Sequence, residues 1–171
     1  MPNIFNENDF TRDGEKSPLK EFLWYAGPLL SERLGSRHLF FDIRSLDPGM
    51  FSFPFHFHRN SEELFVVLSG EATIRFVKEF RKVKKGDVIF FEAGTSGAHQ
   101  VYNHADVPCR YLDIRTNNGT DVCEYPDSGK INITPYHEIY DSGGKVNYYK
   151  NEDNVTGKWP EDILRKKKKT E

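Results

Sequence analysis

Short runs of aliphatic and aromatic residues, separated by turn-forming residues, fill the middle of the chain. The runs are rich in Phe, Val, Ile and Tyr, which are enriched in β-strands. Stretches containing Gly, Pro and Asp lie between them and are suited to reversing the chain. We expect strands over seven ranges: Arg37–Leu46, Phe51–His58, Glu62–Leu68, Ala72–Val77, Asp87–Phe91, Ala98–Asn103 and Arg110–Arg115. Many short strands at this spacing predict an all-β protein, an antiparallel sandwich or barrel.

The two ends of the chain lack this pattern. Residues 1–36 are irregular, and their apolar stretch Phe22–Tyr25 fits either a helical turn or an arm. Nothing after Asn117 indicates a second domain, although Asp121–Ile133 and Lys145–Tyr149 fit edge strands or an arm. We therefore divide the chain into an N-terminal arm (1–36), a β-barrel (37–150) and a C-terminal tail (151–171).

The range Phe51–His58 alternates aromatic and polar residues. Because successive side chains of a strand point to opposite faces, its four phenylalanines share one face, and His56 and His58 share the other. The phenylalanine face needs a cover, which a second sheet, a terminal arm or another subunit can supply. Left open, it would be a larger apolar patch than a monomer usually exposes.

Composition and charge exclude several classes of protein. The 171 residues contain 24 Lys and Arg against 26 Asp and Glu, so we expect no nucleic-acid or membrane partner. Cys109 and Cys123 show no CxxC spacing, which predicts buried thiols rather than disulfides or thiolate metal ligands. The N-terminus has no signal-peptide pattern and no apolar run is long enough to span a membrane. We expect a soluble cytoplasmic protein with a solvated tail at Lys166–Lys169.

Histidines and acidic residues follow one another in an order typical of a metal site. His56 and His58, two apart on a strand, form a bidentate pair of imidazoles. A turn at Arg59–Ser61 then brings a carboxylate back opposite them, followed later along the chain by His99. Strand parity does not choose between Glu62 and Glu63, because both alternating sets of the returning strand are apolar.

These residues resemble the two sequence motifs of the cupin superfamily. The first motif, G-x5-HxH-x3,4-E-x6-G, is matched by Gly49, His56, His58, Glu63 and Gly70. The second, G-x5-P-x-G-x2-H-x3-N, is matched by Gly86, Gly94, His99 and Asn103. More narrowly, the chain resembles single-domain bacterial cupins of unassigned function, through Arg33–Arg37, Pro54–His58, Ala93–Gln100 and Glu124–Lys130.

The chain departs from these motifs at three points. Six residues separate Gly49 from His56, Glu92 replaces the proline, and four residues lie between Gly94 and His99. His104 is the other histidine near the second motif. It falls on the face opposite His99 and lacks the spacing to Asn103, so we prefer His99.

The resemblance implies a double-stranded β-helix, the cupin or jelly-roll barrel. It implies one divalent transition metal ion (Fe, Mn, Ni, Co, Cu or Zn) held by His56, His58, Glu63 and His99, with the spacing to Gly70 selecting Glu63. Cupins commonly dimerise through an apolar face such as that of Phe51–Phe57, so we expect a homodimer.

Function stays open between two interpretations at this point. The first is a metal-dependent enzyme, an isomerase or dioxygenase, acting on a small polar molecule that is sugar-derived or an oxo-acid. The second is a non-catalytic module that binds or senses a small ligand around a structural metal. A third interpretation is a structural barrel without metal. The presence of four candidate ligands in the order of the motifs argues against it.

No catalytic residue can be nominated from the sequence. The polar candidates within the expected strands are Arg44, Tyr102, Tyr111, Asp113 and Arg115. The last three share one face of their strand, and the rule that one face of an antiparallel sheet is solvated places them in solvent.

Overall fold

The chain folds almost entirely into antiparallel β-strands, which confirms the all-β prediction. The computed structural model describes residues 4–6, 14–25, 28–151 and 157. The first elements are β1 (Gly14–Lys16), β2 (Leu23–Tyr25), α1 (Leu30–Arg33), β3 (Leu39–Leu46), β4 (Phe57–His58), β5 (Glu63–Ser69) and β6 (Glu71–Arg75). They are followed by β7 (Phe80–Lys84), β8 (Val88–Phe91), the 3-10 turn η2 (Thr95–Gly97), β9 (Gln100–Tyr102), β10 (Cys109–Thr116), β11 (Asp121–Tyr125), β12 (Lys130–Thr134), β13 (Glu138–Asp141) and the turn η3 (Ser142–Gly144).

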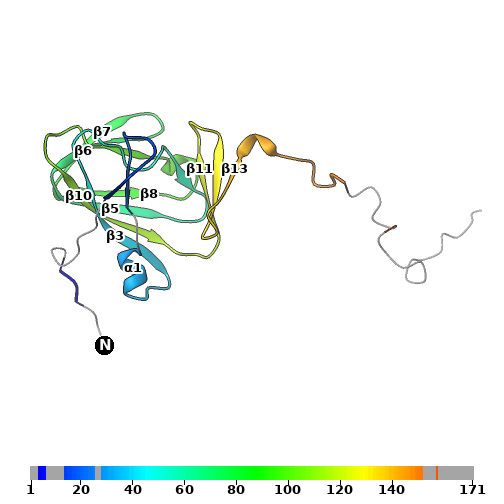
Figure 1. Ribbon diagram of the computed structural model, residues 1–171, viewed down its shortest axis with the longest axis horizontal. Helices are drawn as coiled ribbons and strands as arrows, with labels where there is room; N and C mark the ends of the chain where they lie inside the picture. The colour runs from blue at the N-terminus through cyan, green and yellow to red at the C-terminus, as the bar shows by residue number, and fades with distance from the viewer. Residues whose placement is uncertain (1–3, 7–13, 26–27, 152–156, 158–171) are drawn as a thin grey trace, which may run out of the picture.

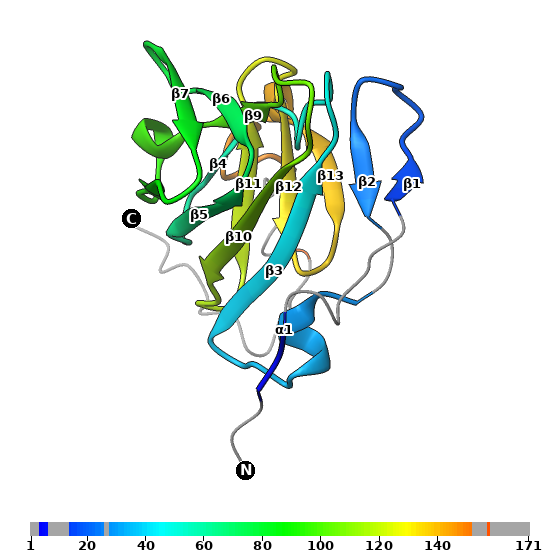
Figure 2. The same cartoon turned by 90° about the vertical axis from the view of Figure 1, so that its left-hand side faces the viewer.

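The strands build a double-stranded β-helix. One sheet has the order β3-β10-β5-β8, and the opposing strands form the sheets β7-β6-β9 and β13-β12-β11-β4. Figure 2 shows β3 running beside β10, with the small β1–β2 hairpin at the edge of the barrel. After β13 the chain leads away from the barrel (Figure 1). Among the described residues, no helix has the length and apolar character needed to cross a membrane.

The apolar core occupies one part of the barrel. Inward-facing side chains of the first sheet and of β7-β6-β9 pack together there: Leu46, Phe65, Val67, Ala72, Ile74, Val83, Phe91, Val101, Cys109 and Tyr111. The remaining part of the interior carries the buried polar side chains, including all three histidines of the predicted site. The fold therefore separates an apolar packing region from a polar pocket.

The segment carrying His56 and His58 is a strand only at Phe57–His58, shorter than predicted. Pro54 has no N–H to donate to a ladder, and the segment also changes its pairing partner. His56 exchanges two backbone hydrogen bonds with His99, at 3.1 and 2.9 Å, whereas β4 pairs with β11. The alternation holds for Phe55 and Phe57, which pack against Ala98 while both histidines face the polar pocket. The Phe53 ring departs from it, since it lies 6.0 Å from the His56 ring and 4.9 Å from Arg44 Cζ.

The phenylalanine face is covered from within the chain. Phe51 N–H donates to Glu21 O at 2.9 Å, and the Phe22 ring lies 6.0 Å from that of Phe51. The Arg75 guanidinium lies 4.0 Å above the Phe55 ring. The N-terminal arm, one of the three predicted covers, therefore packs against the phenylalanine face. An open phenylalanine layer no longer supports a homodimer, which stays a prediction.

Several elements differ from the expected ranges because their burial pattern is weak. Strand β7 has a single buried residue, Val83, and β13 has none, so neither shows a hydrophobic alternation. The range Asp121–Ile133 is split into β11 and β12 by a turn, and Lys145–Tyr149 forms no strand. Phe22–Tyr25 contributes the arm strand β2 rather than a helical turn. The lysine run at Lys166–Lys169 lies outside the described residues.

Two motif residues that are not candidate ligands have structural roles. The fully buried Asn103 donates from Nδ2 to Leu46 O and Val107 O, at 2.7 and 2.9 Å, and accepts from Ala105 N–H. Gly70 has φ +73°, and a Cβ there would lie 2.4 Å from Pro108 O. Asn103 thus ties the end of β3 to the loop before β10, and Gly70 lets that loop approach closely.

We expect Gly70→Ala to destabilise the protein more than Gly86→Ala. Both glycines have a left-handed φ, which costs any other residue ~1–2 kcal/mol. At Gly86 a Cβ meets nothing within 4 Å, whereas at Gly70 it would overlap backbone. The free energy of unfolding from urea denaturation should fall by a further ~1–3 kcal/mol for Gly70→Ala. Equal losses in the two variants would contradict the close approach at Gly70.

Candidate metal centre

Four side chains predicted from the sequence meet in the polar pocket. His56 and His58 come from the segment that ends in β4, Glu63 opens β5, and His99 lies between η2 and β9. Their exposed fractions are only 6%, 6%, 7% and 2%. The two residues that were weighed against them lie elsewhere. Glu62 is exposed, and the His104 Nδ1 lies 2.9 Å from the Thr73 hydroxyl and its Nε2 3.4 Å from Glu71.

Each imidazole is oriented through its Nδ1 atom. The His56 Nδ1 lies 2.8 Å from Pro54 O, and the His99 Nδ1 lies 2.9 Å from Gly97 O. The His58 Nδ1 lies 2.5 Å from the Asp121 Oδ2. Carbonyl and carboxylate oxygens only accept, so these contacts assign the proton to Nδ1. The Nε2 atoms are thereby turned away from these acceptors, which is the arrangement that metal-binding histidines adopt. The Nε2 of His58 also lies 3.2 Å from the Arg115 Nη1.

The available Nε2 atoms converge on the Glu63 carboxylate. The Glu63 Oε2 lies 3.2 Å from His99 Nε2 and 3.8 Å from His58 Nε2. Ligand atoms of His56, Glu63 and His99 all lie within 4.8 Å of one another. Within the described part of the chain, neither Glu63 Oε2 nor His99 Nε2 has a hydrogen-bond partner that satisfies it. Two buried acceptors facing each other need a positive charge between them, and one divalent ion fits this donor set.

The protonation of the pocket suits a cation. Burial, together with the charge of His99, lowers the pKa of His56 to about 3, so this imidazole is neutral at neutral pH. Burial alone would raise the pKa of Glu63, but its interactions with His99 and the other imidazoles hold that pKa well below its usual range. Neutral imidazoles and an ionised carboxylate are the forms that bind metal.

Strand β11 contributes three site residues that the sequence analysis missed. The buried Asp121 carboxylate accepts from His58 through Oδ2 and from the Asn60 N–H through Oδ1. The Tyr125 ring stacks on His56 with centroids 5.9 Å apart. Cys123 pairs with His58 in register, with a potential ligand atom within 4.8 Å of those of His56 and His58. The alternation of these three residues was the only sequence signal that they share a face.

Both cysteines are buried free thiols, as predicted, but Cys123 lies closer to the histidines than expected. Burial, with the nearby Glu63 carboxylate, raises the pKa of Cys123 to about 12. The thiol is therefore protonated at neutral pH. It forms part of the pocket wall beside the four oxygen and nitrogen donors.

The prediction that Tyr111, Asp113 and Arg115 face solvent is wrong. Tyr111 and Asp113 are buried, with exposed fractions of 4% and 6%, and β10 turns this set toward the interior. The carboxylate of Asp113 accepts from Arg44 Nε at 2.7 Å. Burial and the charge of Glu63 raise the pKa of Asp113 to about 7 despite this arginine. Paired charges let the inner face of β3 and β10 stay polar beside the candidate metal centre.

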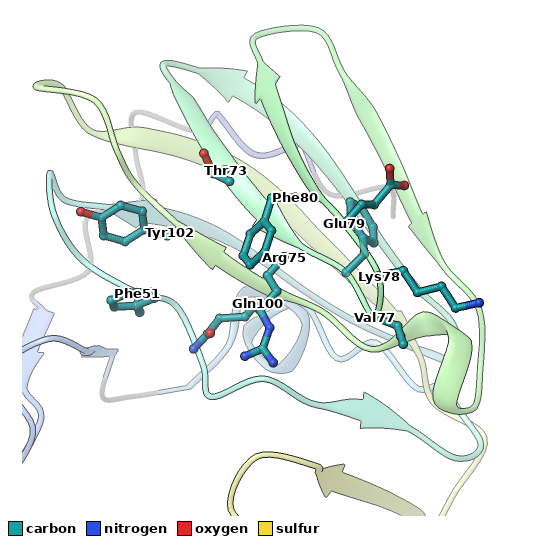
Figure 3. Close-up of a pocket in the computed structure, with 10 residues that line it drawn as sticks. Phe51, Thr73, Arg75, Val77, Lys78, Glu79, Phe80, Gln100 and Tyr102 are labelled. Carbon is teal, nitrogen blue, oxygen red and sulfur yellow. The ribbon is translucent and has the colours of Figure 1, made fainter.

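A groove of about 630 Å³ lies on the outer face of β6 and β9, away from this centre. Figure 3 shows Phe80 in the middle of this groove near Thr73 and Arg75, with Tyr102 toward one end. Tyr102 therefore points away from the candidate ligands. None of the four candidate ligands lines this groove, so its volume does not describe the space around the candidate metal centre.

Comparison with known proteins supports the fold. The family model described as Cupin domain matches residues 43–115. A protein from Acidithiobacillus ferrooxidans, provisionally named a sugar phosphate isomerase, is 21% identical with a TM-score of 0.72, over 84% of this chain and 95% of its own. A sugar phosphate isomerase of the cupin superfamily from Silicibacter pomeroyi is 22% identical with a TM-score of 0.64, over 70% and 77%.

An uncharacterised Klebsiella pneumoniae protein with a double-stranded β-helix domain is 17% identical with a TM-score of 0.52, over 71% of this chain and 96% of its own. No curated protein matches the chain. At these identities the likenesses show the shared fold.

We expect Asp121→Ala to weaken metal binding about 10- to 100-fold, because the variant removes the acceptor that orients His58. Affinity can be measured by competition with a chromophoric chelator. Asp127→Ala is the matched control, since Asp127 is a surface carboxylate paired with Arg75. Equal affinity of the Asp121 variant and the parent would show that His58 is not held through this contact.

Proposed function

We propose that this chain, whose residues 43–115 match the family model described as Cupin domain, is a metal-dependent enzyme of the cupin superfamily. In this proposal, His56, His58, Glu63 and His99 hold one divalent transition metal ion. The substrate is a small polar molecule, sugar-derived or an oxo-acid, and the reaction is an isomerisation. The observation that carries the proposal is the convergence of oriented Nε2 atoms on the Glu63 Oε2, with buried acceptors left unsatisfied.

The donor set suits catalysis as well as binding. Three imidazoles and one carboxylate leave positions open on an octahedral ion. A bound metal would supply Lewis-acid polarisation of a substrate carbonyl or hydroxyl oxygen. The chain's own residues orient the ligands through Pro54 O, Gly97 O and Asp121. The stacked Tyr125 ring and the Phe91 ring, 3.7 Å from that of His99, limit the access of water to the imidazoles.

The choice of isomerisation over oxidation by O2 rests on two structural neighbours. Both the Acidithiobacillus and the Silicibacter proteins carry the name sugar phosphate isomerase, the former provisionally. Their identity to this chain is low, so their names support only the proposed class of reaction and substrate. An iron ion in the centre would instead favour chemistry with O2.

A second function, ligand binding around a structural metal, is favoured by the burial of the site. All four candidate ligands have exposed fractions of 7% or less. A centre this enclosed admits only small molecules. Binding one substrate equivalent without product would support this second function over the enzyme.

We expect purified parent protein to contain close to one metal ion per chain. Plasma mass spectrometry on protein prepared without chelator measures this content and identifies the ion. The double variant His56→Ala/His58→Ala should lose the metal because two of four ligands are removed. His104→Ala should keep it, because His104 contacts Thr73 and Glu71 instead.

Parent protein that contains no metal and takes up none would overturn the metal centre. A panel of sugar phosphates and 2-oxo acids, followed by NMR with metal-loaded protein, then tests turnover. Product formation that disappears in the double variant supports the enzyme. Stoichiometric binding without product supports the structural metal.

A further inference from the structure

Arg115 lies directly beside the candidate metal centre. On β10 it pairs in register with Glu63 on one side and with Phe40 on the other. Its Nη1 lies 3.2 Å from His58 Nε2 and 3.3 Å from His58 Nδ1, and its Cζ lies 5.0 Å from the centre of the Phe40 ring. The guanidinium is thus held between an aromatic ring and a candidate ligand.

No carboxylate neutralises this arginine at ion-pair distance. Among the described residues, none has a carboxylate oxygen within 4.0 Å of Arg115, whereas the other inward arginine, Arg44, has Asp113 at 2.7 Å. Asp121 is the acid whose charge acts on Arg115, but its two oxygens are already used by His58 and by Asn60 N–H. Arg115 is therefore not paired with a carboxylate among the described residues, while Asp121 serves other groups.

Loading the centre would remove the two ring nitrogens of His58 as acceptors for Arg115. The His58 Nδ1 carries the proton that it donates to Asp121, and its Nε2 lone pair would bind the metal. Neither nitrogen can then accept from the guanidinium. A divalent ion beside an unpaired guanidinium also places two cations side by side. An anion bound between them satisfies the N–H donors and offsets this repulsion.

We propose that Arg115 and the metal centre together form an anion subsite for the substrate. It binds a carboxylate or phosphate group of a small molecule whose neighbouring hydroxyl or carbonyl oxygen reaches the metal. This proposal rests on the proposed function and narrows its substrate class to anionic sugars and oxo-acids. The planar guanidinium matches both oxyanions through paired hydrogen bonds. Neutral sugars would offer it only uncharged oxygens, which accept weaker hydrogen bonds and leave the two cations without a counter-charge.

The test compares anion binding by the full-length parent and three variants. Isothermal titration uses four probes, inorganic phosphate, glucose 6-phosphate, pyruvate and neutral glucose, with both Co(II)-loaded and chelator-treated protein. Arg115→Met keeps the apolar stem that packs on Phe40, and Arg115→Lys keeps the charge. The control is Arg81→Met, because Arg81 has a side chain 66% exposed on β7 and pairs with Glu79. Metal content and circular dichroism are recorded for every variant.

We expect loaded parent protein to bind at least one anionic probe more tightly than glucose. Arg115→Met should weaken that binding about 10- to 100-fold while keeping its metal and fold, since a charged hydrogen bond is lost. The affinity of Arg115→Lys should lie between those of Arg115→Met and the parent, and the affinity of Arg81→Met should equal that of the parent. Preference for phosphate or for pyruvate identifies which oxyanion the subsite takes.

Two results would overturn the subsite: loaded parent protein that binds no anionic probe, or equal affinities for the parent and Arg115→Met. If Arg115→Met does not fold, an affinity of Arg115→Lys equal to that of the parent, or no anion binding by the parent, overturns it. Parent protein that refuses metal defeats the proposed function separately. In that case Arg115-dependent anion binding by the chelator-treated protein still supports the subsite, and its absence overturns it.

Discussion

The polar pocket depends on one contact, the 3.2 Å approach of His99 Nε2 to the Glu63 Oε2. Both atoms are buried acceptors, and each Nδ1 proton is already committed to an acceptor on the outer side of the pocket. The pocket therefore requires a positive charge at its centre. The folded chain accommodates this requirement through backbone pairing, because His56 and His99 are hydrogen-bonded neighbours before any side chain is considered.

Charged side chains of both signs surround this centre. Glu63 and Asp121 provide negative charge beside the imidazoles, and Arg44 balances Asp113 further along the inner face. Arg115 is the inward cation without a carboxylate at ion-pair distance among the described residues. A barrel whose interior were apolar throughout would be easier to stabilise. The cost of burying these groups is confined to one part of the interior, and the other part packs conventional aliphatic and aromatic side chains.

Local sequence was enough to predict most strands of the barrel, although not β7 or β13, and the resemblance to the cupin motifs supplied the four candidate ligands. His56, His58 and Glu63 lie in one hairpin-sized segment, and the motif spacing to Gly70 selected Glu63 over Glu62. Asp121, Cys123 and Tyr125 could not be predicted in this way, because β11 meets β4 only through a pairing that joins Cys123 to His58. The rule that one face of an antiparallel sheet is solvated failed at Asp113, because Arg44 on the neighbouring strand β3 neutralises this carboxylate inside the barrel. Long-range strand order, which a single sequence does not reveal, decided both cases.

The backbone bridge between His56 and His99 has a consequence for metal selection. Since the ladder, Pro54 O, Gly97 O and Asp121 already position the imidazoles, the cage is formed by folding rather than by the ion. A preformed set of nitrogen and oxygen donors follows the general affinity order of first-row metals and contributes little discrimination of its own. If the proposed centre binds metal, the identity of the ion would then follow the supply of metals more than any selectivity of the donors.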